Sequence, residues 1–264
     1  MPLTEEQKKA AREKVAWLMT VYQNHCAYRY SQAEELKKTW KYRDSQGVCF
    51  AMSLDWLRRK MFNLNNPGLK QKHELNDPQY NSKSKRVHLT KKHGKLQDAY
   101  LTNKKATRVG RATTDGHITA MVAANVVNSG LDHLTVGACD HVPAYQLDES
   151  PRARNAGLGT ANAHLTFAQK LKDFVERAEG VLAANPDPAV GILFHMQGGN
   201  GGHATAFLLD TGQIRFFDPN VGEFFFDRNT ERRLAVQFVS LLWFDLYHTY
   251  RQFDTLEFEL IRYA

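Results

Sequence analysis

Cys49 has the sequence surroundings of a reactive thiol. It follows Gly47-Val48, and apolar residues at helical spacing come after it at Phe50, Leu54, Leu57 and Met61. This pattern predicts a helix that begins at the cysteine and stops near 63–68. The unpaired amides and the dipole of a helix start favour a thiolate, the nucleophilic form of cysteine. The alternative is that Cys49 is a small buried apolar residue, the common fate of a free cysteine.

His203 ends a glycine-rich segment, Gly198-Gly199-Asn200-Gly201-Gly202, and small residues follow it. Glycines allow other groups to approach an imidazole closely, which suits a general base. A phosphate-binding loop is a competing interpretation. The segment lacks the Lys-Ser/Thr that such a loop requires, and it leads into a strand. A structural histidine is the other alternative.

Asp218 begins the turn Asp218-Pro219-Asn220-x-Gly222. Aspartates at such positions usually bond only to their own backbone. However, the segments 203–209 and 213–218 predict a hairpin closed at 211–212, with a register in which paired residue numbers add up to 421. His203 and Asp218 would then lie opposite each other, about 5 Å apart, so that the carboxylate could hold the imidazole in one tautomer.

The elements that must position these residues follow from periodicity. Helices are predicted near 5–25 (with Thr4-x-x-Gln7 as a capping box), 31–41, 117–128, 167–182 and 230–250, besides the helix that begins at Cys49. Strands are predicted at 191–196, 204–209, 214–217, 223–226 and 256–260. Residues 131–160 look irregular.

This order predicts an α+β fold, with helices packed on a mostly antiparallel β-sheet of about four to five strands. No linker rich in Pro, Gly or Ser divides the chain, so residues 1–264 are predicted to form a single domain. Residues 64–112 are polar, basic and weakly periodic, and they are predicted to be a basic surface excursion with some local helix.

Composition excludes several classes of protein. The 264 residues are 42% hydrophobic and 24% charged, an ordinary globular balance. They contain no apolar run of about 18 residues that could span a membrane, and the polar N-terminus is not a secretory signal peptide. Three cysteines are too few for a disulfide framework, which favours a reducing compartment.

The positive charge is concentrated in the first part of the chain. Residues 1–111 carry a net charge of +14 and the remainder −7, which gives +7 overall. One interpretation is a patch that binds an anionic membrane surface, nucleic acid or an acidic protein. The other is a solvated loop without a specific partner.

Three segments together resemble the YopT-type cysteine proteases, which are papain-like bacterial effectors delivered into host cells. The segments are Gly47-Val48-Cys49-Phe50-Ala51-x-Ser53-Leu54-x-Trp56-Leu57, Gly202-His203-Ala204-x-Ala206 and Phe217-Asp218-Pro219-Asn220-x-Gly222-Glu223-Phe224. The resemblance implies a papain-like core with Cys49 as nucleophile, His203 as base and Asp218 as the third member. It also implies that no metal or organic cofactor takes part.

The oxyanion donor is the remaining part of such a site. Papain-like enzymes use an amide side chain a few residues before the cysteine. Gln46 is the nearest amide, whereas Asp44 is a carboxylate that would repel an oxyanion, so Gln46 is the predicted donor. A surface glutamine without a role is the alternative.

The predicted function is a cysteine endopeptidase that cleaves a host or target protein through a Cys-His-Asp triad and a thioester. No signal peptide is expected, and a specialised secretion system would deliver the protein into the target cytoplasm. One alternative is a glutamine deamidase or transglutaminase with the same triad. Another is a basic module that binds membrane or nucleic acid through residues 70–111, although no nucleic-acid partner is expected for the peptidase. A zinc site assembled from Cys139-Asp140-His141, His133 and His25-Cys26 matches no common ligand spacing.

Overall fold

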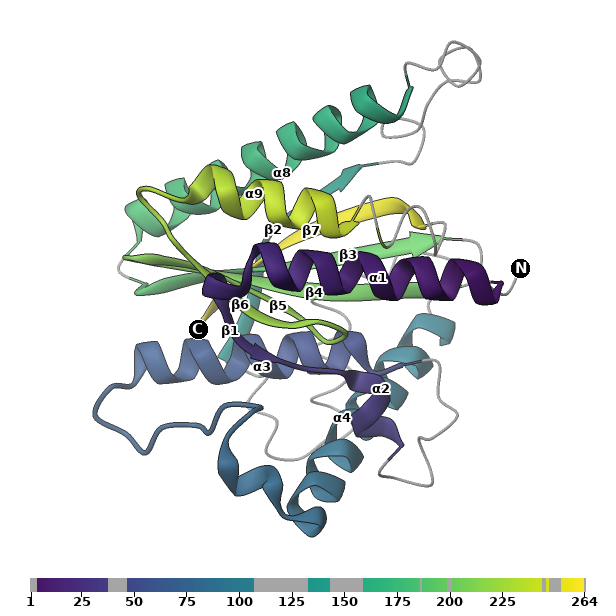
Figure 1. Cartoon of the computed structure of the whole chain (residues 1–264). Helices are drawn as coiled ribbons and strands as arrows, with labels where there is room; N and C mark the ends of the chain where they lie inside the picture. The colour runs from purple at the N-terminus through teal and green to yellow at the C-terminus, as the bar shows by residue number, and fades with distance from the viewer. Residues whose placement is uncertain are drawn as a thin grey trace.

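The protein has a central β-sheet with helices on both faces (Figure 1). Helices α1 (Glu5–Val21), α8 (Gly159–Ala184) and α9 (Arg232–Leu242) cover one face. Helices α2 (Gln32–Leu36), α3 (Cys49–Asn65) and α4 (Lys83–Ala106) cover the other. The computed structural model describes residues 4–37, 47–106, 133–142, 159–185, 187–198, 201–243, 246 and 253–263. The predicted helix at 117–128 lies outside these ranges.

The sheet contains seven strands in the described part of the chain, in the order β1-β6-β5-β4-β3-β7-β2, and every neighbouring pair is antiparallel. The strands are β1 (Cys26–Arg29), β2 (Leu134–Val142), β3 (Ala189–Gly198), β4 (Gly201–Asp210), β5 (Gln213–Asp218), β6 (Gly222–Asp227) and β7 (Phe253–Tyr263). The predicted α+β class is confirmed, but the predicted count of four to five strands was too low. The two missed strands, β1 and β2, form the edges of the sheet. β1 is only four residues long, and β2 lies in a stretch that looked irregular.

The alternation of side chains along the central strands divides the interior into two cores. On β3, Val190, Ile192 and Phe194 pack in the core beneath α1, α8 and α9, whereas Leu193 packs in the core shared with α3 and α4. α3 is buried along most of its length, from Cys49 to Met61. The sheet and α3 therefore form a rigid support for anything attached to the start of that helix.

The predicted starts of α1 and α3 are confirmed, whereas α8 begins at Gly159, earlier than the predicted 167 and within the stretch 131–160 that looked irregular. Thr4 and Gln7 form the capping box of α1, with backbone-to-side-chain bonds of 2.9 and 3.2 Å. The helix expected over 31–41 is shorter within the described residues, where α2 ends at Leu36. None of the described helices is both long enough and apolar enough to cross a membrane.

The basic stretch 64–112 contains more helix than the predicted surface excursion with some local helix, because residues 83–106 form the long helix α4. Its inward side buries Leu89, Leu96 and Tyr100 together with polar groups. On the same side, the half-buried Lys92 and the buried His93 bind the carboxylate of Asp55 on α3 at 3.0 and 3.1 Å. Charged residues on the buried face hide the apolar period of the helix, so sequence periodicity did not reveal it.

Gly222 begins β6 in a conformation that other residues rarely adopt. Its φ is +136°, and a Cβ there would overlap the carbonyl oxygen of Tyr28 and lie 2.9 Å from Cα of Arg29. Gly222→Ala is therefore expected to lower the free energy of unfolding by at least about 2 kcal/mol, because it adds both backbone strain and a clash with β1. Urea unfolding measures this loss. Gly212→Ala is the matched control, since its Cβ would meet nothing within 4 Å. Equal stability of the two variants would contradict the prediction.

Candidate active site

Cys49 is the first residue of α3, as the sequence predicts. Gly47, with a φ of +117°, turns the chain into the helix, and Val48 occupies the N-cap without a side-chain bond to the helix. The Cys49 Sγ lies 4.0 Å from the carbonyl oxygen of Gly202, at the start of β4. The start of α3 therefore faces the beginning of the strand that carries the candidate base.

His203 and Asp218 form a buried pair at this point. The His203 Nε2 lies 3.0 Å from the Asp218 Oδ1, and both side chains are almost inaccessible to solvent. The Cys49 thiol makes a side-chain hydrogen bond with the same imidazole. Because Nε2 faces Asp218, Nδ1 is the ring nitrogen left for the sulfur. The thiol, the imidazole and the carboxylate thus form a continuous chain of contacts.

The register of the hairpin differs from the prediction by two residues. Ala206 pairs with Phe217, and Leu209 pairs with Ile214, so paired residue numbers add up to 423 and not 421. The predicted register conflicted with the two-residue loop at 211–212, which places 210 opposite 213. His203 and Asp218 therefore meet diagonally, a geometry that long side chains can still bridge.

Two residues of α3 fix the helix against the strands that carry the pair. One turn after Cys49, the Ser53 Oγ donates a hydrogen bond of 2.9 Å to the carbonyl oxygen of Ala204. Trp56 stacks on Phe217 with ring centroids 5.5 Å apart, and its Nε1 donates to Glu223 at 2.7 Å. The three segments that carry the resemblance therefore contact one another around one site.

The charges of the site favour a thiolate–imidazolium pair. Burial by itself would raise the pKa of Cys49, but the hydrogen bond and charge of His203, together with backbone bonds from Ala204 and Phe50, bring that pKa below its ordinary value. Burial would lower the pKa of His203, but the charge and hydrogen bond of Asp218 and the contact with Cys49 raise it to about 10. The proton that the thiol loses is therefore held on the imidazole.

Comparison with known protein families agrees with this chemistry. The model of the family Peptidase_C58, described as "Yersinia/Haemophilus virulence surface antigen", matches residues 21–264. The chain belongs to this family. It is therefore a cysteine peptidase, and the resemblance to the YopT type is confirmed.

Two solved structures are similar to this peptidase over most of its length. One is the Pseudomonas avirulence protein AvrPphB, with 16% identity and a TM-score of 0.43 over 83% of this chain and 93% of that chain. The other is the ubiquitin-specific protease of a murine cytomegalovirus tegument protein, solved with a ubiquitin-based suicide substrate. It has 11% identity and a TM-score of 0.40 over 91% of this chain and 86% of that chain. No curated protein sequence matches the peptidase.

The backbone amides around the peptidase's Cys49 are mostly occupied. Val48 N–H donates to the Gln32 Oε1 at 2.9 Å, and Ala51 N–H donates to the Gln97 Oε1 at 3.2 Å. Among the described residues, nothing accepts the Cys49 N–H, so this amide can bind an oxyanion. Gln46, the predicted side-chain donor, lies outside the described residues.

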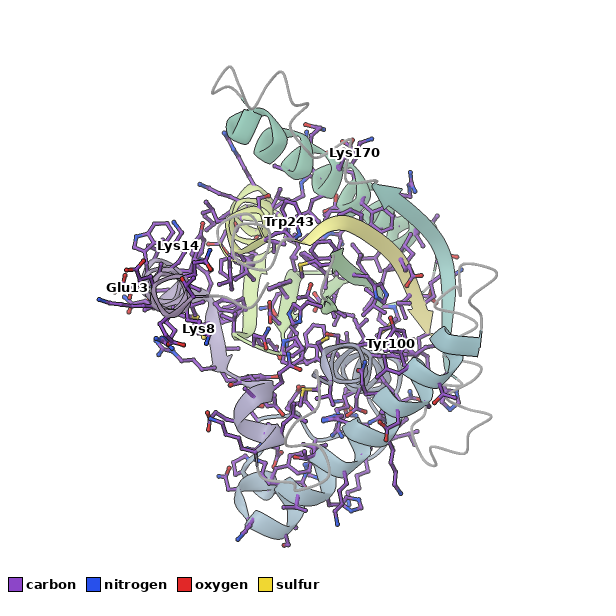
Figure 2. All side chains as sticks on the ribbon, turned by 90° about the vertical axis from the view of Figure 1, so that its right-hand side faces the viewer. Lys8, Glu13, Lys14, Tyr100, Lys170 and Trp243 are labelled. Carbon is purple, nitrogen blue, oxygen red and sulfur yellow. The ribbon has the colours of Figure 1, made fainter. Side chains whose placement is uncertain are left out.

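Gln32 and Gln97 are site residues that sequence reasoning missed. Gln32 lies sixteen positions before Val48, and Gln97 lies on the helix α4 that was not predicted. The ring of Tyr100, one turn after Gln97, stacks on that of Phe50 with centroids 4.1 Å apart. Figure 2 shows Tyr100 of α4 beside α3. Only the packing of α4 against the start of α3 brings these residues to the site.

The zinc site considered from the sequence is incompatible with the sheet order. Cys139, Asp140 and His141 lie on β2, whereas His25 and Cys26 lie at the start of β1, and five strands separate β1 from β2. Six inter-strand spacings of about 4.8 Å put the two groups roughly 29 Å apart along the sheet, far beyond the roughly 2 Å of a zinc–ligand bond.

Proposed function

We propose that this peptidase is an endopeptidase that cleaves a protein of a target cell, with Cys49 as nucleophile, His203 as general base and acid, and Asp218 as the orienting carboxylate. The observation that carries the proposal is the contact chain from a thiol at a helix start to a buried imidazole and on to a buried carboxylate. The family description, a virulence surface antigen of Yersinia and Haemophilus, supports a bacterial protein that acts on a host.

In the proposed mechanism, the Cys49 thiolate attacks the carbon of a peptide carbonyl, and the carbonyl oxygen becomes an oxyanion that accepts the Cys49 N–H. His203 then gives its proton to the leaving nitrogen, so the C–N bond breaks and a thioester remains. A water molecule attacks the thioester while His203 takes its proton. The carboxylic acid product departs, and sulfur recovers the charge of the resting thiolate.

Asp218 keeps the imidazole in the orientation that this sequence of steps needs. Its carboxylate accepts from Nε2, so Nδ1 faces the sulfur and can carry the transferred proton. The same charge stabilises the imidazolium in the resting state. Full burial of both groups keeps water from weakening this interaction.

Replacing Cys49 tests the proposal, and Cys26 offers a matched control because it is also a free cysteine among the described residues. Wild type and Cys26→Ala are expected to react at Cys49 with a biotinylated iodoacetamide probe, and both should produce new protein N-termini in host cells. Cys49→Ala should do neither, while melting close to wild type. Mapping of N-termini by mass spectrometry gives the result.

Mass spectrometry of the same samples also distinguishes peptide cleavage from chemistry on a glutamine side chain. Cleavage produces new N-termini, whereas deamidation raises the substrate mass by about 1 Da without breaking the chain. New N-termini that persist with Cys49→Ala would rule out Cys49 as the nucleophile. Mass gains without new N-termini would replace the endopeptidase with a deamidase.

A further inference from the structure

Gln32 connects the turn that carries Cys49 to the turn that carries Asp218. Its Oε1 accepts the Val48 N–H at 2.9 Å, and its Nε2 donates to the Asn220 Oδ1 at 2.6 Å. The backbone N–H of Gln32 also donates to the carbonyl oxygen of Pro219 at 2.7 Å. The side chain is largely buried, with 8% of its residue surface exposed. One residue thus holds both halves of the candidate site.

The orientation of this amide is fixed by a group that can only donate. Val48 N–H is a backbone donor, so the oxygen of Gln32 must face it and the nitrogen must face Asn220. The oxygen of Asn220 therefore faces Gln32, and its Nδ2 lies 3.5 Å from the His203 Nε2. Because Nε2 donates to Asp218, these two nitrogens are both donors and only pack against each other. The Gln32 amide thus fixes the orientation of Asn220, which lies against the His203–Asp218 pair.

Asn220 is in turn attached directly to the carboxylate. Its backbone N–H donates to the Asp218 Oδ1 at 2.7 Å, the same oxygen that contacts the His203 Nε2. A shift of Asn220 would therefore move Asp218, and with it the imidazole. Within the turn that follows β5, the Val221 N–H donates to the carbonyl oxygen of Asp218 at 3.1 Å. The bridge from Gln32 adds a link from outside the turn.

Gly47 makes room for the bridge. A Cβ at this position would lie 3.0 Å from the Gln32 Oε1, closer than ordinary contacts, and the φ of +117° is itself unfavourable for other residues. The turn before Cys49 is thus shaped around the Gln32 amide.

We propose that Gln32 is a positioning residue that sets the distance between the Cys49 sulfur and the His203–Asp218 pair by bridging their two turns. The inference rests on the proposed triad. Its physical basis is that α3 and the hairpin are separate elements, and that a misplacement of about 1 Å between reacting groups can cost about 100-fold in rate.

The test measures the rate at which iodoacetamide alkylates Cys49 in the full chain, from pH 5 to 10, by mass spectrometry. Gln32→Ala is expected to slow alkylation by about 10- to 100-fold at pH 6, because a displaced imidazole no longer stabilises the thiolate. The difference in rate should narrow toward pH 10, since a growing fraction of an unsupported thiol is then ionised. Gln71→Ala, the same substitution on an exposed loop, should match wild type at every pH.

Gln32→Met separates bridging from simple packing and covers the case in which the alanine variant does not fold. Methionine has nearly the length and volume of glutamine but neither accepts from Val48 N–H nor donates to Asn220, so the bridge should break and alkylation at pH 6 should fall as for Gln32→Ala. A folded Gln32→Met protein with the wild-type pH profile would overturn the inference. If wild type itself has the profile of an ordinary thiol, the proposed triad fails as well, so the two failures are distinguishable.

Discussion

His203→Ala is expected to slow the alkylation of Cys49 by iodoacetamide at pH 6 by about two orders of magnitude. In wild type the imidazolium of His203 lowers the pKa of the thiol against the effect of burial. Without it burial remains, and fewer than about one in a hundred thiols of even ordinary pKa (about 8.5) are ionised at pH 6. Mass spectrometry of the alkylated protein over a time course measures both rates.

The pH dependence of cleavage and alkylation by wild type gives a second measure of the Cys49–His203 pair. The pKa of His203 is raised to about 10, so the imidazolium persists through neutral pH and loses its proton only as the pH rises toward that value. Cleavage, which needs this proton for the leaving amine, should decline there, whereas alkylation, which needs only the thiolate, should not.

His88→Ala, on the exposed side of α4, is the matched control for His203→Ala. An unchanged alkylation rate at pH 6 in His203→Ala would contradict the proposed pairing.

Asp55→Asn is expected to lower the free energy of unfolding by about 3–5 kcal/mol at pH 7. The Asp55 carboxylate is fully buried and binds Arg58 and Arg59 at 2.8 Å and Lys92 at 3.0 Å. Removing its charge leaves these cations in the interior without a counter-charge, and the attachment of α4 to α3 weakens. Urea unfolding followed by circular dichroism measures the loss.

The neighbouring cations hold the pKa of Asp55 well below its ordinary value despite burial. A carboxylate of this kind stabilises the fold at every pH above the pKa that it has in the unfolded chain. The contribution disappears as the pH falls through the lower pKa that it has in the folded protein. The difference in free energy of unfolding between wild type and Asp55→Asn should therefore be fully present at pH 7 and shrink only in strong acid. Asp98→Asn, on the exposed side of α4, should be nearly neutral. Adding Lys92→Met to Asp55→Asn should restore part of the stability, and a further loss would argue against charge as the cause.

The ion cluster also explains part of the basic character of residues 64–112. Lys92 points inward to Asp55, and Arg86 lies 3.6 Å from Glu35 on α2. These basic side chains neutralise buried carboxylates of neighbouring helices and are not available to an external anion. Positive charge counted along a sequence therefore overstates the charge offered to a partner.

The sequence by itself determined the class of fold and the candidate reactive groups. Local rules were sufficient for this purpose, because the glycine before Cys49, the apolar period of α3 and the turn after Asp218 each act within a few residues. The four central strands β3 to β6 were predicted in order for the same reason, since short turns join neighbours in the chain.

Tertiary structure decided what depends on contacts between distant segments. The edge strands β1 and β2 carry little signal of their own and are defined by pairing with β6 and β7. Gln32 and Gln97 reach the start of α3 from other helices, and α4 is stable as a buried element because Asp55 neutralises its charged face. The free energy of these contacts arises only once the chain has folded, so no pattern of neighbouring residues records them.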